Sequence, residues 1–90
     1  MKIDFTTLIF KENGAFVSYC PELGVASCGD TVDEARHRGK EAVRLFLEES
    51  KRMGTLQDIL QEEGYVEKDL AKHDWASPQL IVTEHSEVAF

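Results

Sequence analysis

The chain has 90 residues, of which 42% are hydrophobic and 30% charged, a composition typical of one small soluble domain. Seventeen acidic against ten basic residues give a net charge of −7, which works against direct binding to nucleic-acid phosphates. No apolar run approaches the roughly 20 residues of a membrane span, and a signal-peptide pattern is absent. We therefore expect a cytoplasmic protein without a membrane partner.

The first third of the chain predicts an antiparallel sheet. Residues 3–11 alternate and are rich in β-branched and aromatic side chains, which indicates a strand. The Asn-Gly pair at 13–14 supplies the positive φ angles of a tight hairpin, and residues 15–20 form the returning strand. Residues 21–24 form a corner because their proline lacks an N–H, and the apolar run 25–28 is a third strand.

A long helix follows the third strand. Thr31 and Glu34 make a capping box at its start, and Gly54 is typical of the residue that ends a helix. Apolar residues recur at spacings of three and four, at Val32, Ala35, Gly39, Ala42, Val43, Phe46 and Leu47. This stripe predicts a helix that packs on the sheet, with Gly39 allowing close approach.

The last third is harder to interpret. Thr55 is expected to cap a short helix that ends at Gly64, and only residues 67–73 in the following polar stretch could be helical. Leu80, Ile81 and Val82 predict a C-terminal strand, either on the sheet or given to a second subunit. We expect one α+β domain over residues 1–90, with a core at 1–64 and a C-terminal extension at 65–90.

Residues 15–46 carry a family resemblance. The matching residues are 14–23, 26–27, 29–31, 34–35, 40–42 and 45–47, in the order strand, Cys-Pro-Glu-Leu, strand, Gly-Asp-Thr, helix. This pattern resembles the HicB family of antitoxins, which are the partners of HicA toxins. The resemblance implies a partial RNase H-like fold, with a small antiparallel sheet against one long helix.

The resemblance also implies a function. A HicB-like domain binds and neutralises a basic HicA-type toxin that cleaves mRNA, and an acidic chain suits such a partner. Acidity equally serves solubility. Many family members have Cys-Pro-Glu-Leu-Pro-Gly-Cys, whereas the corner here is shorter. Residues 65–90 match neither DNA-binding module that many members carry, so we expect a short, solitary HicB-like domain without direct DNA binding.

The RNase H-like topology raises a less favoured alternative, a weak metal-dependent nuclease. Asp4 lies on the first strand, and Glu22 and Asp30 follow at a corner and a helix start. Helix capping explains Asp30 better than metal binding does, and an exposed corner explains Glu22 better. Cys20 and Cys28 are expected to be buried, reduced thiols, and His37, His73 and His85 are scattered. We therefore expect no enzyme activity, catalytic residue, metal or cofactor.

Two sets of residues are predicted to make contacts. The candidate partner-binding residues are Phe16, Tyr19, Pro21, Glu22 and Leu23. The candidate oligomer interface is residues 80–82, because an apolar strand needs a neighbour, and we expect a homodimer or higher oligomer. The alternative function is a solitary, self-associating domain with another cytoplasmic protein partner.

Overall fold

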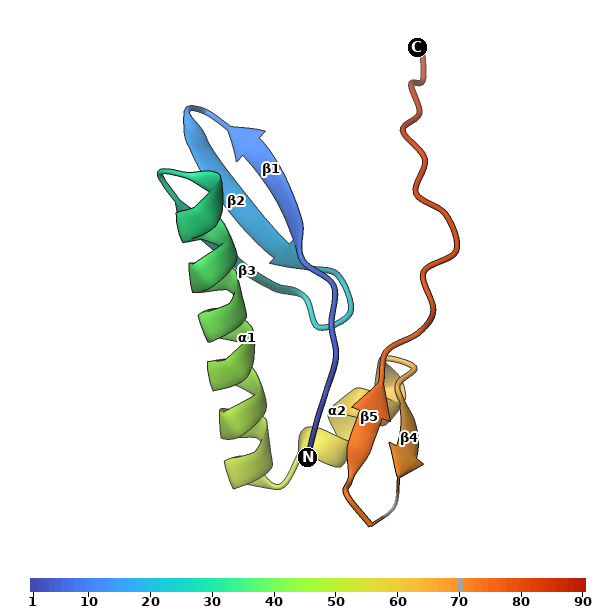
Figure 1. The fold of residues 1–90 in the computed structure, drawn as a ribbon. Helices are drawn as coiled ribbons and strands as arrows, with labels where there is room; N and C mark the ends of the chain where they lie inside the picture. The colour runs from blue at the N-terminus through green and yellow to red at the C-terminus, as the bar shows by residue number, and fades with distance from the viewer. Residues whose placement is uncertain (70) are drawn as a thin grey trace.

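The chain folds as a helix-covered sheet joined to a smaller helix-and-hairpin unit, in a computed structural model that describes residues 1–69 and 71–90 (Figure 1). In chain order the elements are β1 (Leu8–Glu12), β2 (Ala15–Cys20), β3 (Val25–Gly29), α1 (Val32–Met53), α2 (Leu56–Glu62), β4 (Val66–Asp69) and β5 (Asp74–Ala76). The predicted α+β class, three N-terminal strands, long helix and short helix are confirmed.

The larger sheet has the order β1-β2-β3, and both pairs of neighbours are antiparallel. Asn13 and Gly14 join β1 to β2 with φ angles of 50° and 82°, the left-handed conformation of a tight hairpin turn. Residues directly opposite each other in antiparallel strands lie on the same face. The pairs Ile9–Ser18 and Ser18–Ser27 therefore place these three residues on one face of the sheet.

The helix α1 lies mainly over β3 and β2, and β1 lies farther from it (Figure 1). Thr31 caps the helix by accepting a hydrogen bond from the Glu34 N–H at 3.0 Å, and Gly54 ends it with a φ of 77°. The Glu34 carboxylate accepts from the Asp30 N–H at 3.2 Å. In a capping box the expected donor would be the N–H of Thr31, one residue later. The α1 boundaries follow from this local chemistry.

Gly39 brings α1 close to the sheet. A Cβ atom at this position would lie 2.8 Å from the Cβ of Ser18, which is only 1% exposed. The predicted close approach of Gly39 is confirmed. The contact also identifies the covered side of the sheet as the face that carries Ser18.

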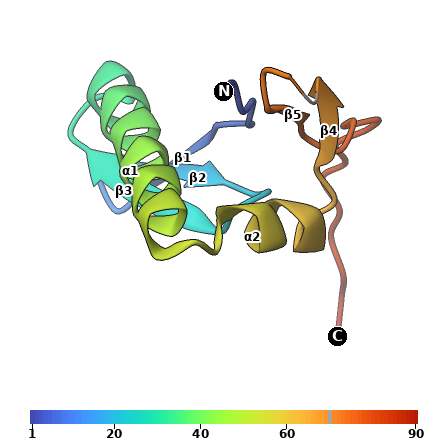
Figure 2. The same cartoon turned by 90° about the horizontal axis from the view of Figure 1, so that it is seen from below.

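Apart from the contact between α1 and the sheet, a hydrophobic cluster, here called the second cluster, holds α2 and the β4–β5 hairpin together. Figure 2 shows the path of the chain from α2 into this hairpin. The buried members of the cluster are Leu56, Leu60, Tyr65 and Trp75, and Ile3, Leu23 and Leu47 pack against them. Trp75 also binds the N-terminal segment. Its backbone N–H donates to the Lys2 carbonyl at 2.7 Å, and Ile3 forms an isolated parallel β-bridge with it. Residues placed by sequence in a C-terminal extension thus complete this cluster.

Two strand and helix predictions are wrong. The first strand begins at Leu8 instead of residue 3, because the N-terminal segment pairs with β5. Within the expected helix 67–73, residues 67–69 belong to β4 and residues 71–73 to a turn, because Trp75 supplies a buried anchor for a hairpin. Within that range Leu70 lies outside the described residues.

The predicted C-terminal strand is absent from the sheet. Residues 77–90, here called the C-terminal tail, form neither helix nor strand. Leu80 and Thr83 line a cavity together with Leu8 and Pro21, and the chain then ends away from the body (Figure 1). The Ser77 N–H donates to the Asp4 carboxylate at 2.6 Å, which fixes the point where the tail leaves the hairpin unit. In the part of the chain that the structure describes, the tail pairs with no strand, so Leu80, Ile81 and Val82 have no partner in a β-ladder.

Within residues 1–69 and 71–90, neither helix combines the length and the apolar character that crossing a bilayer would require.

Candidate functional site

The face of the β1-β2-β3 sheet opposite α1 is apolar and open. Its residues, placed by register, are Leu8, Phe10, Glu12, Ala15, Val17, Tyr19, Ala26 and Cys28. Phe10 is 53% exposed and Tyr19 is 37% exposed, although aromatic side chains on a sheet usually pack against a second layer. Contiguous exposed apolar surface marks an interaction site in a folded domain. We call these eight residues the open face.

Glu22 is a structural brace at the corner between β2 and β3. Its carboxylate accepts from the Thr6 N–H at 3.0 and 3.1 Å and from the Thr6 hydroxyl at 2.7 Å. Burial alone would raise the pKa of Glu22, but the hydrogen bonds from Thr6 outweigh it and hold the pKa below its ordinary value. The ionised carboxylate thus fixes the N-terminal segment against the corner.

The two cysteines lie in different environments. Cys20 is buried, and burial followed by the neighbouring Glu22 raises the pKa of its thiol to about 11. A thiol that stays protonated at neutral pH is a poor nucleophile. Cys28 is exposed on the open face opposite Val17, so the expectation that both cysteines are buried is wrong for Cys28.

Asp4, the residue behind the nuclease alternative, also has structural partners. Its carboxylate accepts from the Ser77 N–H, and its backbone carbonyl accepts from the Tyr65 hydroxyl at 2.7 Å. Burial raises the pKa of Tyr65, so this hydroxyl remains a donor. Within the described ranges 1–69 and 71–90, no three His, Cys, Asp or Glu side chains gather closely enough to hold a metal ion.

The predicted partner-binding residues do not form a single surface. Phe16 lies on the face that α1 covers, whereas Tyr19 lies on the open face. Pro21 is exposed at the corner, and Leu23 packs against the second hydrophobic cluster. Only Tyr19 among these four therefore belongs to the sheet surface that is available to a partner.

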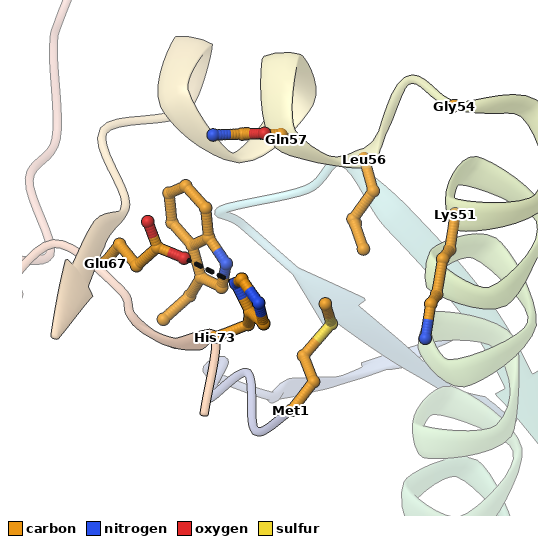
Figure 3. A pocket seen from close by; sticks show the side chains of 8 residues that line it. Met1, Lys51, Gly54, Leu56, Gln57, Glu67 and His73 are labelled. Carbon is orange, nitrogen blue, oxygen red and sulfur yellow. Dashed lines mark hydrogen bonds and ion pairs between the residues drawn. The ribbon is translucent and has the colours of Figure 1, made fainter. Parts of the chain in front are cut away.

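A cavity of about 270 Å³ lies between the end of α1, the start of α2 and the hairpin (Figure 3). At its wall the His73 Nδ1 and a Glu67 carboxylate oxygen lie within hydrogen-bond distance, at 3.2 Å, and Lys51 lines the same cavity. Ligand pockets usually have volumes of about 300–1,000 Å³. Because this cavity is small and mixed in charge, it is a weaker candidate than the open face.

The sequence missed Leu8, Phe10 and Val17 as site residues. The signal was present, because an Asn-Gly turn of two residues pairs Phe10 with Val17 and Leu8 with Tyr19. The alternation alone could not reveal which of the two faces α1 would cover. The pairing of His73 with Glu67 required the hairpin to be recognised first.

No known protein family, curated protein or solved structure matches this chain. The resemblance to HicB antitoxins, and the RNase H-like relationship that it implies, therefore stay predictions from the motif residues.

Proposed function

We propose that this chain is a cytoplasmic interaction protein of the HicB antitoxin type, which binds and neutralises a basic HicA-type toxin that cleaves mRNA. The observation that carries the proposal is the open face, where Phe10 and Tyr19 present aromatic surface beside Leu8 and Val17. Aromatic side chains at the centre of an apolar patch are the usual anchors of protein interfaces. The sequence motif supplies the identity of the partner.

The distribution of charge supports a basic partner. The arginines of α1 pair with acids on the same helix, in the pairs Asp33–Arg36, Glu34–Arg38, Glu41–Arg44, Arg44–Glu48 and Glu49–Arg52. Because α1 nearly balances its own charges, the net charge of −7 arises outside it. Asp58 and Glu62 on α2 and Glu63 directly after it, for example, follow one another without an intervening base. Such a field accelerates association with a basic protein.

The geometry gives less support to a nuclease. Two-metal catalysis needs carboxylates that converge on ions about 3.5–4 Å apart. Asp4 accepts from the Ser77 N–H, and Glu22 accepts from Thr6. Both carboxylates have hydrogen-bonding roles in holding the N-terminal segment, so we favour a binding role over catalysis.

Co-expression with a HicA-type toxin tests the proposal. The wild-type chain should restore growth of cells that produce the toxin and should form a complex by isothermal titration calorimetry. Phe10→Asp places a charge among the apolar side chains of the open face and should weaken binding by about 2 kcal/mol or more, as expected for an interface anchor.

Leu45→Asp is the matched control, because Leu45 is 54% exposed on α1 and Phe10 is 53% exposed on the sheet. Both variants add one negative charge, and only Phe10→Asp should lose binding. Equal loss in both variants, or no complex between the wild-type chain and any HicA-type toxin tested, would contradict the proposal. Ribonuclease activity that Asp4→Asn abolishes would favour the nuclease instead.

A further inference from the structure

We propose that the C-terminal tail of one copy of this chain adds a strand to the free edge of β1 in a second copy, and that the exchange is mutual. The inference is independent of the proposed function, because it concerns the backbone edge of β1, although Leu8 and Phe10 of the open face would flank the added strand. It rests on two features that one chain leaves unsatisfied, an apolar extended segment and an unpaired strand edge.

The tail is apolar where a strand would need to be. Leu80, Ile81 and Val82 are 65%, 80% and 64% exposed, and the tail also exposes Val88 and Phe90. Consecutive apolar residues point to opposite sides of an extended chain, so this segment is apolar on both sides. A segment with two apolar sides is typical of a strand within a sheet and not of a chain terminus that is exposed to solvent.

The edge of β1 offers backbone groups for such a strand. β1 has only β2 as a neighbour in the described sheet, and Glu12 pairs with Ala15 beside the two-residue turn. The pair that flanks such a turn is hydrogen-bonded, so alternate residues of β1 bond to β2. By this alternation, the N–H and C=O groups of Ile9 and Lys11 point to the free edge, where an added strand can bind them.

The side chains beside this edge match the tail. Leu8 and Phe10 lie on the open face of β1, and Ile9 lies on the α1 side. A strand formed by residues 79–83 would place Leu80 and Val82 on one face and Ile81 on the other. Both faces of the sheet would thus continue with apolar side chains across the new strand.

A second copy fits better than the tail of the same chain. In its own chain the tail leaves beside Ser77, and Leu80 and Thr83 line a cavity of about 350 Å³ together with Leu8 and Pro21, so the tail passes near the start of β1 without pairing with it. Figures 1 and 2 both show the tail extending away from the body. Two copies related by a two-fold axis each supply one tail and one edge, so the assembly closes as a dimer.

The mass of the full chain in solution, measured by light scattering over a range of concentrations, tests the proposal. The wild-type chain should be a dimer that dissociates on dilution. Val82→Asp should lower the dimer affinity about 10-fold or more, because a charge replaces an apolar side chain in the interface. Val66→Asp is the control, since Val66 on β4 is 63% exposed and Val82 is 64% exposed. The control should remain dimeric.

A mixing experiment separates exchange between copies from docking within one chain. Lys11→Pro removes an N–H from the free edge of β1, and proline is tolerated on an edge strand when its nitrogen faces away from the ladder. At a concentration where the wild type is dimeric and a dimer about 10-fold weaker is not, Lys11→Pro and Val82→Asp should each be monomeric alone. Mixed together they should form a heterodimer, because one retains the tail and the other retains the edge.

Three results would overturn the inference. One is a wild-type chain that stays monomeric at its highest soluble concentration. Another is a Val82→Asp dimer as stable as that of the wild type. The third is a mixture of the two variants that remains monomeric, which would place the tail on the β1 edge of its own chain or leave it without an edge.

Discussion

At the scale of single residues, Glu22 links the corner of the motif to the start of the chain. The sequence places this carboxylate in an exposed corner suited to a partner. The structure instead directs it at Thr6, which contributes a backbone N–H and a hydroxyl. Charge-assisted hydrogen bonds of this kind are about twice as strong as neutral ones. Glu22 is therefore better explained as a stabilising residue than as a contact residue.

Glu22→Gln should destabilise the fold by about 1–3 kcal/mol at neutral pH, since a neutral amide replaces a charged acceptor. The folded-state pKa of Glu22 is lowered, so its contribution is present above the ordinary value of 4.5 and is lost as the pH falls through the folded pKa. Urea unfolding at neutral and acidic pH measures the effect. The variant and the wild type should converge in acid, and a constant difference would contradict this role.

Glu62→Gln is the control for this experiment, because Glu62 is exposed on α2. It should change stability by less than about 0.5 kcal/mol at neutral pH.

At the scale of elements, the contact between α1 and the sheet depends on one missing side chain. Gly39 faces Ser18 across the interface, and the buried residues Ala35 and Val43 lie one turn away on either side. The helical spacing of these positions was readable from the sequence. The identity of the partner residue was not, because both faces of β2 carry apolar and small side chains.

Gly39→Ala should destabilise the fold by about 1–3 kcal/mol, although alanine is the better helix former by about 1 kcal/mol. The reason is that the new Cβ atom would meet Ser18 at 2.8 Å between Cβ atoms. Chemical unfolding measures the loss, and Ser18→Gly should restore part of it in the double variant. Additive losses in the double variant would mean that the two residues do not meet.

At the scale of the whole molecule, the N-terminal segment joins the two packing units. Ile3 reaches Trp75 of the hairpin, while Leu23 from the corner and Leu47 from α1 pack on the second cluster. These contacts connect residues far apart in the chain. We therefore expect the sheet and the hairpin unit to unfold together.

Leu60→Ala should lower the free energy of unfolding by about 2–5 kcal/mol, because Leu60 is fully buried in the second cluster. The fluorescence of Trp75, the single tryptophan, reports on the hairpin unit, and far-ultraviolet circular dichroism reports mainly on α1. Both transitions should shift together. A fluorescence transition that moved alone would show that the two units unfold separately.

The sequence by itself determined the parts of this protein that depend on neighbours in the chain. The Asn13–Gly14 turn, the Thr31 cap and the Gly54 end of α1 follow from backbone sterics and hydrogen bonds within a few residues. Their positions could be predicted because the interacting groups are already adjacent before folding.

Only the tertiary structure decided which face of the sheet α1 covers, that the segment around Trp75 is a hairpin, and that the tail pairs with no strand among the described residues. These outcomes depend on which distant apolar surfaces meet, and several pairings satisfy the same local pattern. The open face is therefore a property of the packing. Phe10 and Tyr19 form a candidate binding surface because the close contact between Gly39 and Ser18 places α1 on the opposite face of the sheet.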